Sequence, residues 1–98
     1  MGAAEPARPV DPAERVEAAV LAHPAVARLD GGFASYLPGR RVDGVRLAER
    51  TSVSVVLKFG VLKSARPIPE VVAELRAAVR AVTGPAPVDV TVADLEVL

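Results

Sequence analysis

The stretch from Thr51 to Val92 constrains the fold more than any other part of the sequence. Apolar residues alternate with more polar ones over residues 53–59, which is typical of a β-strand with one buried side. An amphipathic helix is predicted from Pro69 to about Val82, and a second strand over residues 88–92. Two strands joined by one helix form a βαβ unit, which requires parallel strands and a right-handed crossover.

The helix prediction rests on an apolar stripe with helical spacing. Glu70 lies near the start of this segment and Arg80 near its end, as the helix dipole favours, and Gly84 is a natural stop. The stripe that we expect to face the sheet consists of Val71, Val72, Leu75, Ala78, Val79 and Val82.

Alternation along the first strand predicts which side chains share a face of the sheet. The buried face is expected to carry Val53, Val55, Leu57 and Phe59, and the opposite, mixed face Ser54, Val56 and Lys58. Val56 is apolar on the mixed face, so it is a candidate contact residue for another copy or another protein. Single exposed apolar residues are nevertheless ordinary.

A first helix is predicted to begin at Asp11, which can act as its N-cap. Pro12 suits the first helical position and Glu14 has capping-box spacing. Pro24 ends the helix, because the residue before a proline avoids helical angles. Residues 25–29 form either a short strand or the end of the helical region.

Turn residues divide the segment that follows. Asp30-Gly31-Gly32 predicts a turn, and residues 33–37 a strand. Asp43-Gly44 suits a tight hairpin turn, but Arg40-Arg41 makes a poor strand. We therefore expect a loop over residues 38–43 and a strand over 44–48.

Together these elements predict an α+β fold with a small mixed β-sheet of three to four strands and two helices on one face, in the order α-β-β-β-α-β. The 98 residues suffice for one domain, assigned to residues 11–98, and residues 1–10 are expected to be a disordered tail. Only 3% of the residues are aromatic, so Val, Leu and Ala must build the core. Such a core is modest, and we expect a homo-oligomer that buries further surface.

The sequence contains no motif that would carry catalysis or hold a cofactor or a metal. It has no cysteine, and His23 is the single histidine, for which a structural role at the helix end is favoured. The carboxylates show no acid–base or metal-ligand spacing, and no nucleophile elbow or phosphate-binding loop is present. We therefore expect no enzyme activity, no cofactor and no metal site.

The one local basic and aromatic cluster consists of Arg40 and Arg41, with Arg46 nearby and Phe33 and Tyr36 just upstream. It is interpreted either as a contact for a phosphate or a protein partner, or as a solvated loop, which is favoured. Twelve basic and 12 acidic residues cancel, and the chain has neither Asn nor Gln, so nucleic-acid binding is not favoured. No apolar run reaches the length of a membrane span and no signal-peptide pattern is present, so we expect a cytoplasmic protein without direct membrane insertion.

Seven segments resemble the alkaline shock protein family, which is the envelope stress response family of Gram-positive bacteria, and in particular its actinobacterial members. They are residues 19–29 (AVLAHPAVARL), 36–42 (YLPGRRV), 44–47 (GVRL), 55–60 (VVLKFG), 67–72 (PIPEVV), 83–84 (TG) and 88–92 (VDVTV). The resemblance covers nearly everything after Asp11. The sequence departs from the family pattern at Ala25, where Gly is usual, and at Asp89, where Asn is common.

The resemblance implies a small, non-enzymatic cytoplasmic protein of cell-envelope homeostasis. It implies self-association and a membrane-anchored protein partner, through which the chain would become membrane-associated. The candidate interaction residues are Arg40, Arg41, Arg46, Tyr36 and Val56. The alternative is a small nucleic-acid-binding α/β module that uses the basic loop of residues 40–46; an enzyme is the least favoured class.

Overall fold

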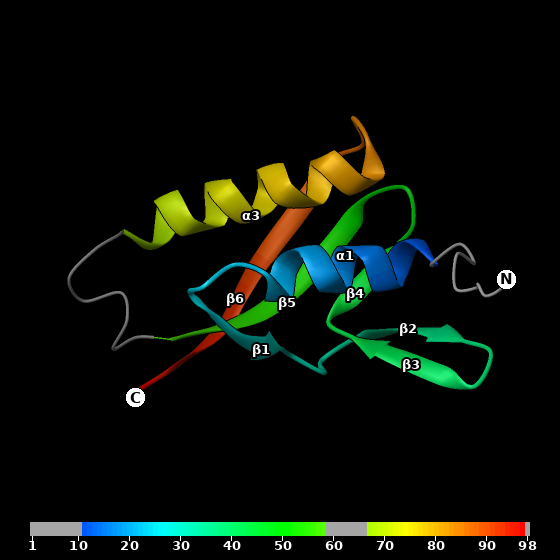
Figure 1. The fold of residues 1–98 in the computed structure, drawn as a ribbon, viewed down its shortest axis with the longest axis horizontal. Helices are drawn as coiled ribbons and strands as arrows, with labels where there is room; N and C mark the ends of the chain where they lie inside the picture. The colour runs from blue at the N-terminus through cyan, green and yellow to red at the C-terminus, as the bar shows by residue number, and fades with distance from the viewer. Residues whose placement is uncertain (1–10, 59–66, 98) are drawn as a thin grey trace, which may run out of the picture.

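The computed structural model describes residues 11–58 and 67–97. Its elements are α1 (Pro12–Leu21), β1 (Val26–Leu29), β2 (Ala34–Leu37), β3 (Arg40–Asp43), β4 (Val45–Leu47), β5 (Thr51–Lys58), α3 (Ile68–Thr83) and β6 (Val88–Glu96). The fold is α+β, as predicted: the two helices pack against a four-stranded sheet, and β2 and β3 form a separate hairpin (Figure 1).

Strand β5 is the centre of the four-stranded sheet. One of its edges pairs in parallel with β6, from Thr51 opposite Val88 to Lys58 opposite Glu96. The other edge pairs antiparallel with two strands: residues 51–53 of β5 pair with β4, and residues 55–57 of β5 pair with β1. The predicted parallel β-α-β unit is therefore confirmed as β5, α3 and β6.

The core lies between the sheet and the two helices. Val71, Leu75 and Val79 of α3 are buried as predicted, whereas Val72, Ala78 and Val82 of the same stripe are partly exposed. These side chains join one aliphatic cluster with Val16 and Val20 of α1 and with Val53, Val55 and Leu57 of β5. Since the three β5 residues alternate along the strand, both helices cover the same face of the sheet.

The start of α1 follows the sequence prediction. The Asp11 side chain accepts a hydrogen bond from the backbone N–H of Ala13 at 2.9 Å, and Pro12 occupies the first helical position. Glu14, which was expected to close a capping box, pairs its carboxylate with Arg40 instead. The helix ends at Leu21, just before the predicted stop at Pro24.

The predicted loop over residues 38–43 is wrong, because Arg40–Asp43 forms strand β3. Leu37 lies opposite Arg40 in the β2–β3 register, so Pro38 and Gly39 make a two-residue turn, with Gly39 at a φ of 72°. Val42 is fully buried in the core and anchors the strand. Residues 25–29, for which the sequence allows either a strand or a helix end, contain β1.

Val56 does not lie on an exposed surface, contrary to the expectation. It lies on the face opposite the core cluster, but it is only 1% exposed, and its neighbour on that face, Ser54, is 4% exposed. Arg28 of β1 and Asp94 of β6 lie beside Val56 in the sheet. The predictions for residues 1–10, Phe59 and the loop of residues 60–66 fall outside the described residues.

Candidate interaction surface

The structure separates the predicted basic cluster into two sites. Tyr36 lies on β2 and both Arg40 and Arg41 lie on β3, so these three residues belong to the hairpin. Arg46 lies on β4, which is part of the four-stranded sheet. The two sites differ in the partners of their guanidinium groups.

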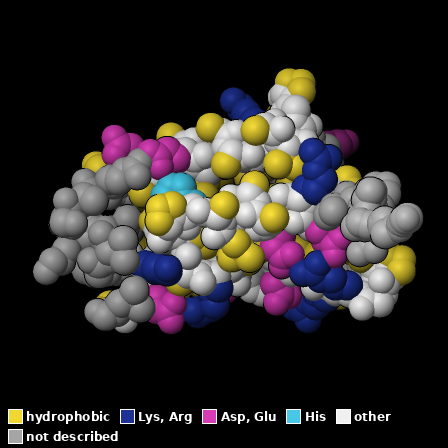
Figure 2. Space-filling view, in the orientation of Figure 1, with side chains coloured by type: hydrophobic (Ala, Val, Ile, Leu, Met, Phe, Trp, Pro, Cys, Tyr) yellow, Lys and Arg dark blue, Asp and Glu magenta, His cyan; other side chains and the backbone are white. Residues whose placement is uncertain are grey.

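Arg40 fastens the hairpin to α1. Its guanidinium pairs with the carboxylate of Glu14 and, at 2.7 Å, with that of Glu17. The hydrogen bonds that Arg40 donates to these two carboxylates raise its pKa. Figure 2 shows acidic and basic side chains gathered where α1 meets the hairpin. Arg40 therefore has a structural role, since both carboxylates belong to its own chain.

Tyr36 and Arg41 form an exposed pair on the same hairpin. They lie opposite each other in the β2–β3 register, and the Arg41 guanidinium carbon is 5.8 Å from the centroid of the Tyr36 ring. Arg41 Nε also lies 2.7 Å from Asp43 Oδ1. Tyr36 is 76% exposed, so the hairpin presents an aromatic ring with a cation held beside it.

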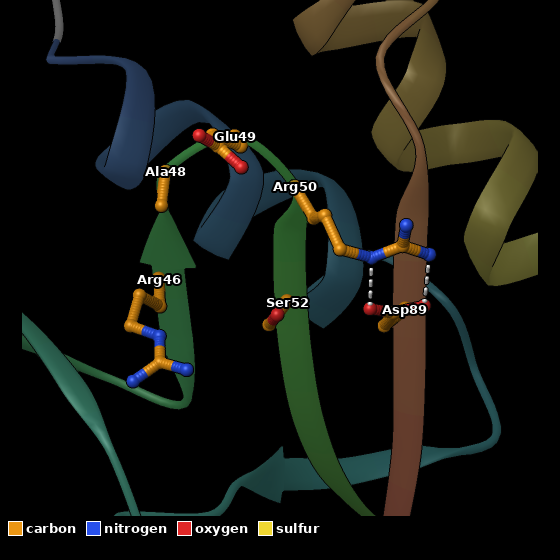
Figure 3. A pocket seen from close by; sticks show the side chains of 6 residues that line it. All are labelled: Arg46, Ala48, Glu49, Arg50, Ser52 and Asp89. Atoms are coloured by element: carbon orange, nitrogen blue, oxygen red, sulfur yellow. Dashed lines mark hydrogen bonds and ion pairs between the residues drawn. The ribbon is translucent and has the colours of Figure 1, made fainter.

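A second surface lies at the end of the sheet, on the face away from the helices. A row of side chains across β4, β5 and β6 consists of Arg46, Ser52 and Asp89. Arg46 and Ser52 are next in sequence to the core residues Val45 and Val53, so their side chains lie on the opposite face of the sheet. They line an open depression of about 510 Å³ (Figure 3), whose full lining is Arg46, Ala48, Glu49, Arg50, Ser52 and Asp89.

An ion pair closes one side of this depression. Arg50 lies in the bend just before β5 and reaches to β6, with Nε 2.7 Å from Asp89 Oδ2 and Nη2 2.8 Å from Asp89 Oδ1. This contact lowers the pKa of Asp89 and raises that of Arg50, chiefly through the hydrogen bonds between the two side chains. Bidentate geometry of this kind fixes the orientation of both groups.

Arg46 has a different environment. Its guanidinium carbon lies 5.5 Å from the centroid of the Phe33 ring. Within residues 11–58 and 67–97, no carboxylate lies within ion-pair distance of it. Arg46 is therefore the member of the predicted cluster whose charge is not neutralised by a neighbouring carboxylate of the described chain.

His23, in the bend that follows α1, contacts α3. Its Nε2 lies 2.8 Å from Glu74 Oε1 on α3, and its Nδ1 accepts the backbone N–H of Ala25 at 3.1 Å. Its side chain is 11% exposed. These contacts agree with the structural role that the sequence favoured.

Two further features of the described residues bear on function. No group of three His, Cys, Asp or Glu side chains in that part of the chain could hold a metal ion. Of the helices in the same residues, none has both the length and the apolar character that crossing a membrane needs.

Sequence reasoning missed the partners of the arginines. Glu14 and Glu17 are three residues apart on one helix, so they share a face, and this spacing is visible in the sequence. Nothing local connects either of them to Arg40, or Arg50 to Asp89. These contacts depend on the register of β3 and on the pairing of β5 with β6.

No protein-family model matches the sequence, and comparisons with curated proteins and with solved structures give no significant match either. The alkaline shock resemblance therefore remains an expectation based on the motifs in the sequence.

Proposed function

We propose that this chain is a non-enzymatic scaffold protein of the envelope stress response, which self-associates and binds a membrane-associated protein partner. The resemblance of its motifs to the alkaline shock protein family supplies the class. The observation that carries the binding role is the exposed Tyr36–Arg41 pair on a hairpin that Arg40 fastens to α1.

This pair has the properties of an interface anchor. Tyr and Arg are enriched among the residues that dominate binding energy in protein interfaces. A side chain that is already held in place loses less conformational entropy on binding than a free one. Here Arg41 is positioned by Asp43 and by the Tyr36 ring, and the ion pairs of Arg40 limit movement of the hairpin.

The proposed location is the cytoplasmic side of the membrane, reached through the partner. The test is fractionation of native cells that produce the tagged chain. The unchanged chain is expected in the membrane fraction, and Tyr36→Ala is expected to release most of it to the soluble fraction. Tyr36→Phe keeps the ring and should retain the membrane association.

Val97→Ala is the matched control, because Val97 is also 76% exposed but is the last described residue and lies outside the hairpin. It should leave the distribution unchanged. A chain found only in the soluble fraction, or one whose distribution ignores Tyr36→Ala, would contradict the proposal.

The alternative function, a nucleic-acid-binding module, has one observation in its favour, which is the charge of Arg46. Against it, Arg40 and Arg41 already pair with carboxylates of their own chain. A salt titration of binding decides the matter, because phosphate contacts weaken steeply as the salt concentration rises. The alternative requires binding at low salt that Arg46→Ala weakens; a chain that shows no binding at low salt excludes it.

A further inference from the structure

Strand β6 forms an edge of the sheet. It is nine residues long and pairs with β5 along one side. The backbone N–H of Thr51 donates to the carbonyl of Pro87 at 3.0 Å, so the backbone groups of residues 87, 89 and 91 point toward β5. Those of Val88, Val90 and Val92 consequently point away from the sheet.

The contacts of these outward groups differ along the strand. The Val88 carbonyl accepts a hydrogen bond from Nε of Arg76 on α3, at 3.2 Å. In the described residues, the outward backbone groups of Val90 and Val92 have no backbone hydrogen-bond partner. Their side chains are partly exposed at the margin of the core. The open part of the edge is therefore centred on Thr91.

Charge usually protects a sheet edge from pairing with another strand. On β6, contacts of the carboxylates within the same chain weaken this protection. Arg50 pairs with Asp89 at 2.7 Å, and Arg28 pairs with Glu96 at 3.1 Å. The Asp94 side chain accepts the backbone N–H of Leu95. An approaching strand would meet two carboxylates that are already neutralised.

We propose that a second copy of this chain pairs with this edge, β6 against β6 and antiparallel, about a twofold axis at Thr91. Val90 would then lie opposite Val92 of the partner subunit, and the axis would repeat this pair once. In each pair, the outward N–H and C=O groups of the two residues would form hydrogen bonds with each other. Asp89 would lie opposite Ala93 of the partner subunit, so no two carboxylates face each other. The two four-stranded sheets would join into one.

A second copy fits this edge because the pairing is self-complementary. The axis leaves the Val88 carbonyl to Arg76 and uses only the open backbone groups. It also brings two Thr91 side chains face to face, and threonine pairs across neighbouring strands are favourable. Thr91 is exposed on the helix-free face, so it can be changed without altering the core.

The inference rests on the proposed function for its premise of self-association, and it names the surface. The test uses sedimentation velocity of the purified full chain. The unchanged chain is expected to be a dimer. Thr91→Asp and Thr91→Lys each place two like charges on the axis, so each variant alone is expected to sediment as a monomer of 10.2 kDa. An equimolar mixture of the two variants should recover the dimer, because opposite charges then meet.

Val90→Pro provides an independent test. It removes an N–H that points away from β5, which an edge strand tolerates, and it should abolish the dimer while circular dichroism stays unchanged. Val90→Thr keeps the N–H and the branched shape, and should remain dimeric. A monomeric unchanged chain, dimers of either charged variant alone, or a mixture that stays monomeric would overturn the inference. Dimers of either charged variant alone would overturn this inference and leave the self-association of the scaffold in place. A chain that dimerises through β6 but is absent from the membrane fraction would overturn only the scaffold function.

Discussion

Gly44 and Ser54 meet backbone to backbone where the chain passes from β3 into β4. The Ser54 N–H donates to the Gly44 carbonyl at 2.9 Å, and the Ser54 carbonyl accepts the N–H of Asp30 at 2.8 Å. Ser54 therefore joins the start of β4 to the end of β1 along one edge of β5. Gly44 has a φ of 72°, and a Cβ added there would lie 2.7 Å from the Ser54 oxygen.

Gly44→Ala should therefore destabilise the protein more than an alanine at another left-handed glycine. Gly39 is the matched control, because its φ is also 72° but a Cβ there would meet nothing within 4 Å. Gly39→Ala should cost about 1–2 kcal/mol for the backbone conformation alone. Gly44→Ala adds the clash with Ser54, and we expect a loss above about 2 kcal/mol.

Urea unfolding of both variants measures these free energies. Equal losses for Gly39→Ala and Gly44→Ala would show that the contact with Ser54 adds nothing to the conformational cost.

The βαβ unit could be predicted from the sequence because its periodic pattern is local. The apolar positions of α3 and the alternation along β5 each fix an element without knowledge of its neighbours. The parallel pairing of β5 with β6 then follows from the intervening helix. In this part of the chain, local preference and tertiary packing agree.

Strand β3 could not be predicted because its stabilising contacts are distant in sequence. Arg40 is a poor strand residue when considered alone, but its charge is neutralised by Glu14 and Glu17 on α1. The hairpin also depends on Val42, whose burial requires the core of the other elements. The prediction that Val56 is exposed is wrong for a related reason. Alternation gives the face of its side chain correctly, but the exposure of the side chain depends on the neighbouring strands.

Leu75→Ala should be among the most destabilising single changes in the described core. Leu75 is fully buried between α3 and the sheet, so truncation leaves a cavity and should cost about 2–5 kcal/mol. Leu47→Ala is the control, because Leu47 is 37% exposed and should cost less than about 1.5 kcal/mol. Chemical denaturation measures both; similar losses would contradict the difference in burial between the two leucines.

Asp11→Ala should weaken α1 at its start. The substitution removes the acceptor of the Ala13 N–H, and loss of an N-cap costs about 0.5–2 kcal/mol. Asp11→Asn keeps an oxygen acceptor and should cost much less. Thermal unfolding followed by circular dichroism compares the two variants, and an Asp11→Asn loss as large as that of Asp11→Ala would exclude the capping role.

The Arg50–Asp89 pair should make stability depend on pH in the acid range. Arg50 lowers the pKa of Asp89 below its ordinary value of 3.8, so the folded state holds this proton less tightly than the unfolded state does. The contribution of the pair is therefore fully present above about pH 3.8 and is lost as the pH falls through the folded pKa. Both side chains are half exposed, so salt should reduce the effect.

Carboxyl-carbon NMR titration of Asp89 measures this shift directly. Arg50→Met removes the partner and should return the pKa of Asp89 toward 3.8, whereas Arg46→Met, on the same face of the sheet, should leave the low pKa in place. Two short hydrogen bonds from Arg50 stabilise the ionised carboxylate, while Arg46 is not among the groups that shift the pKa of Asp89. An Asp89 that titrates at the same pH in both variants would mean that the contact with Arg50 does not persist in solution.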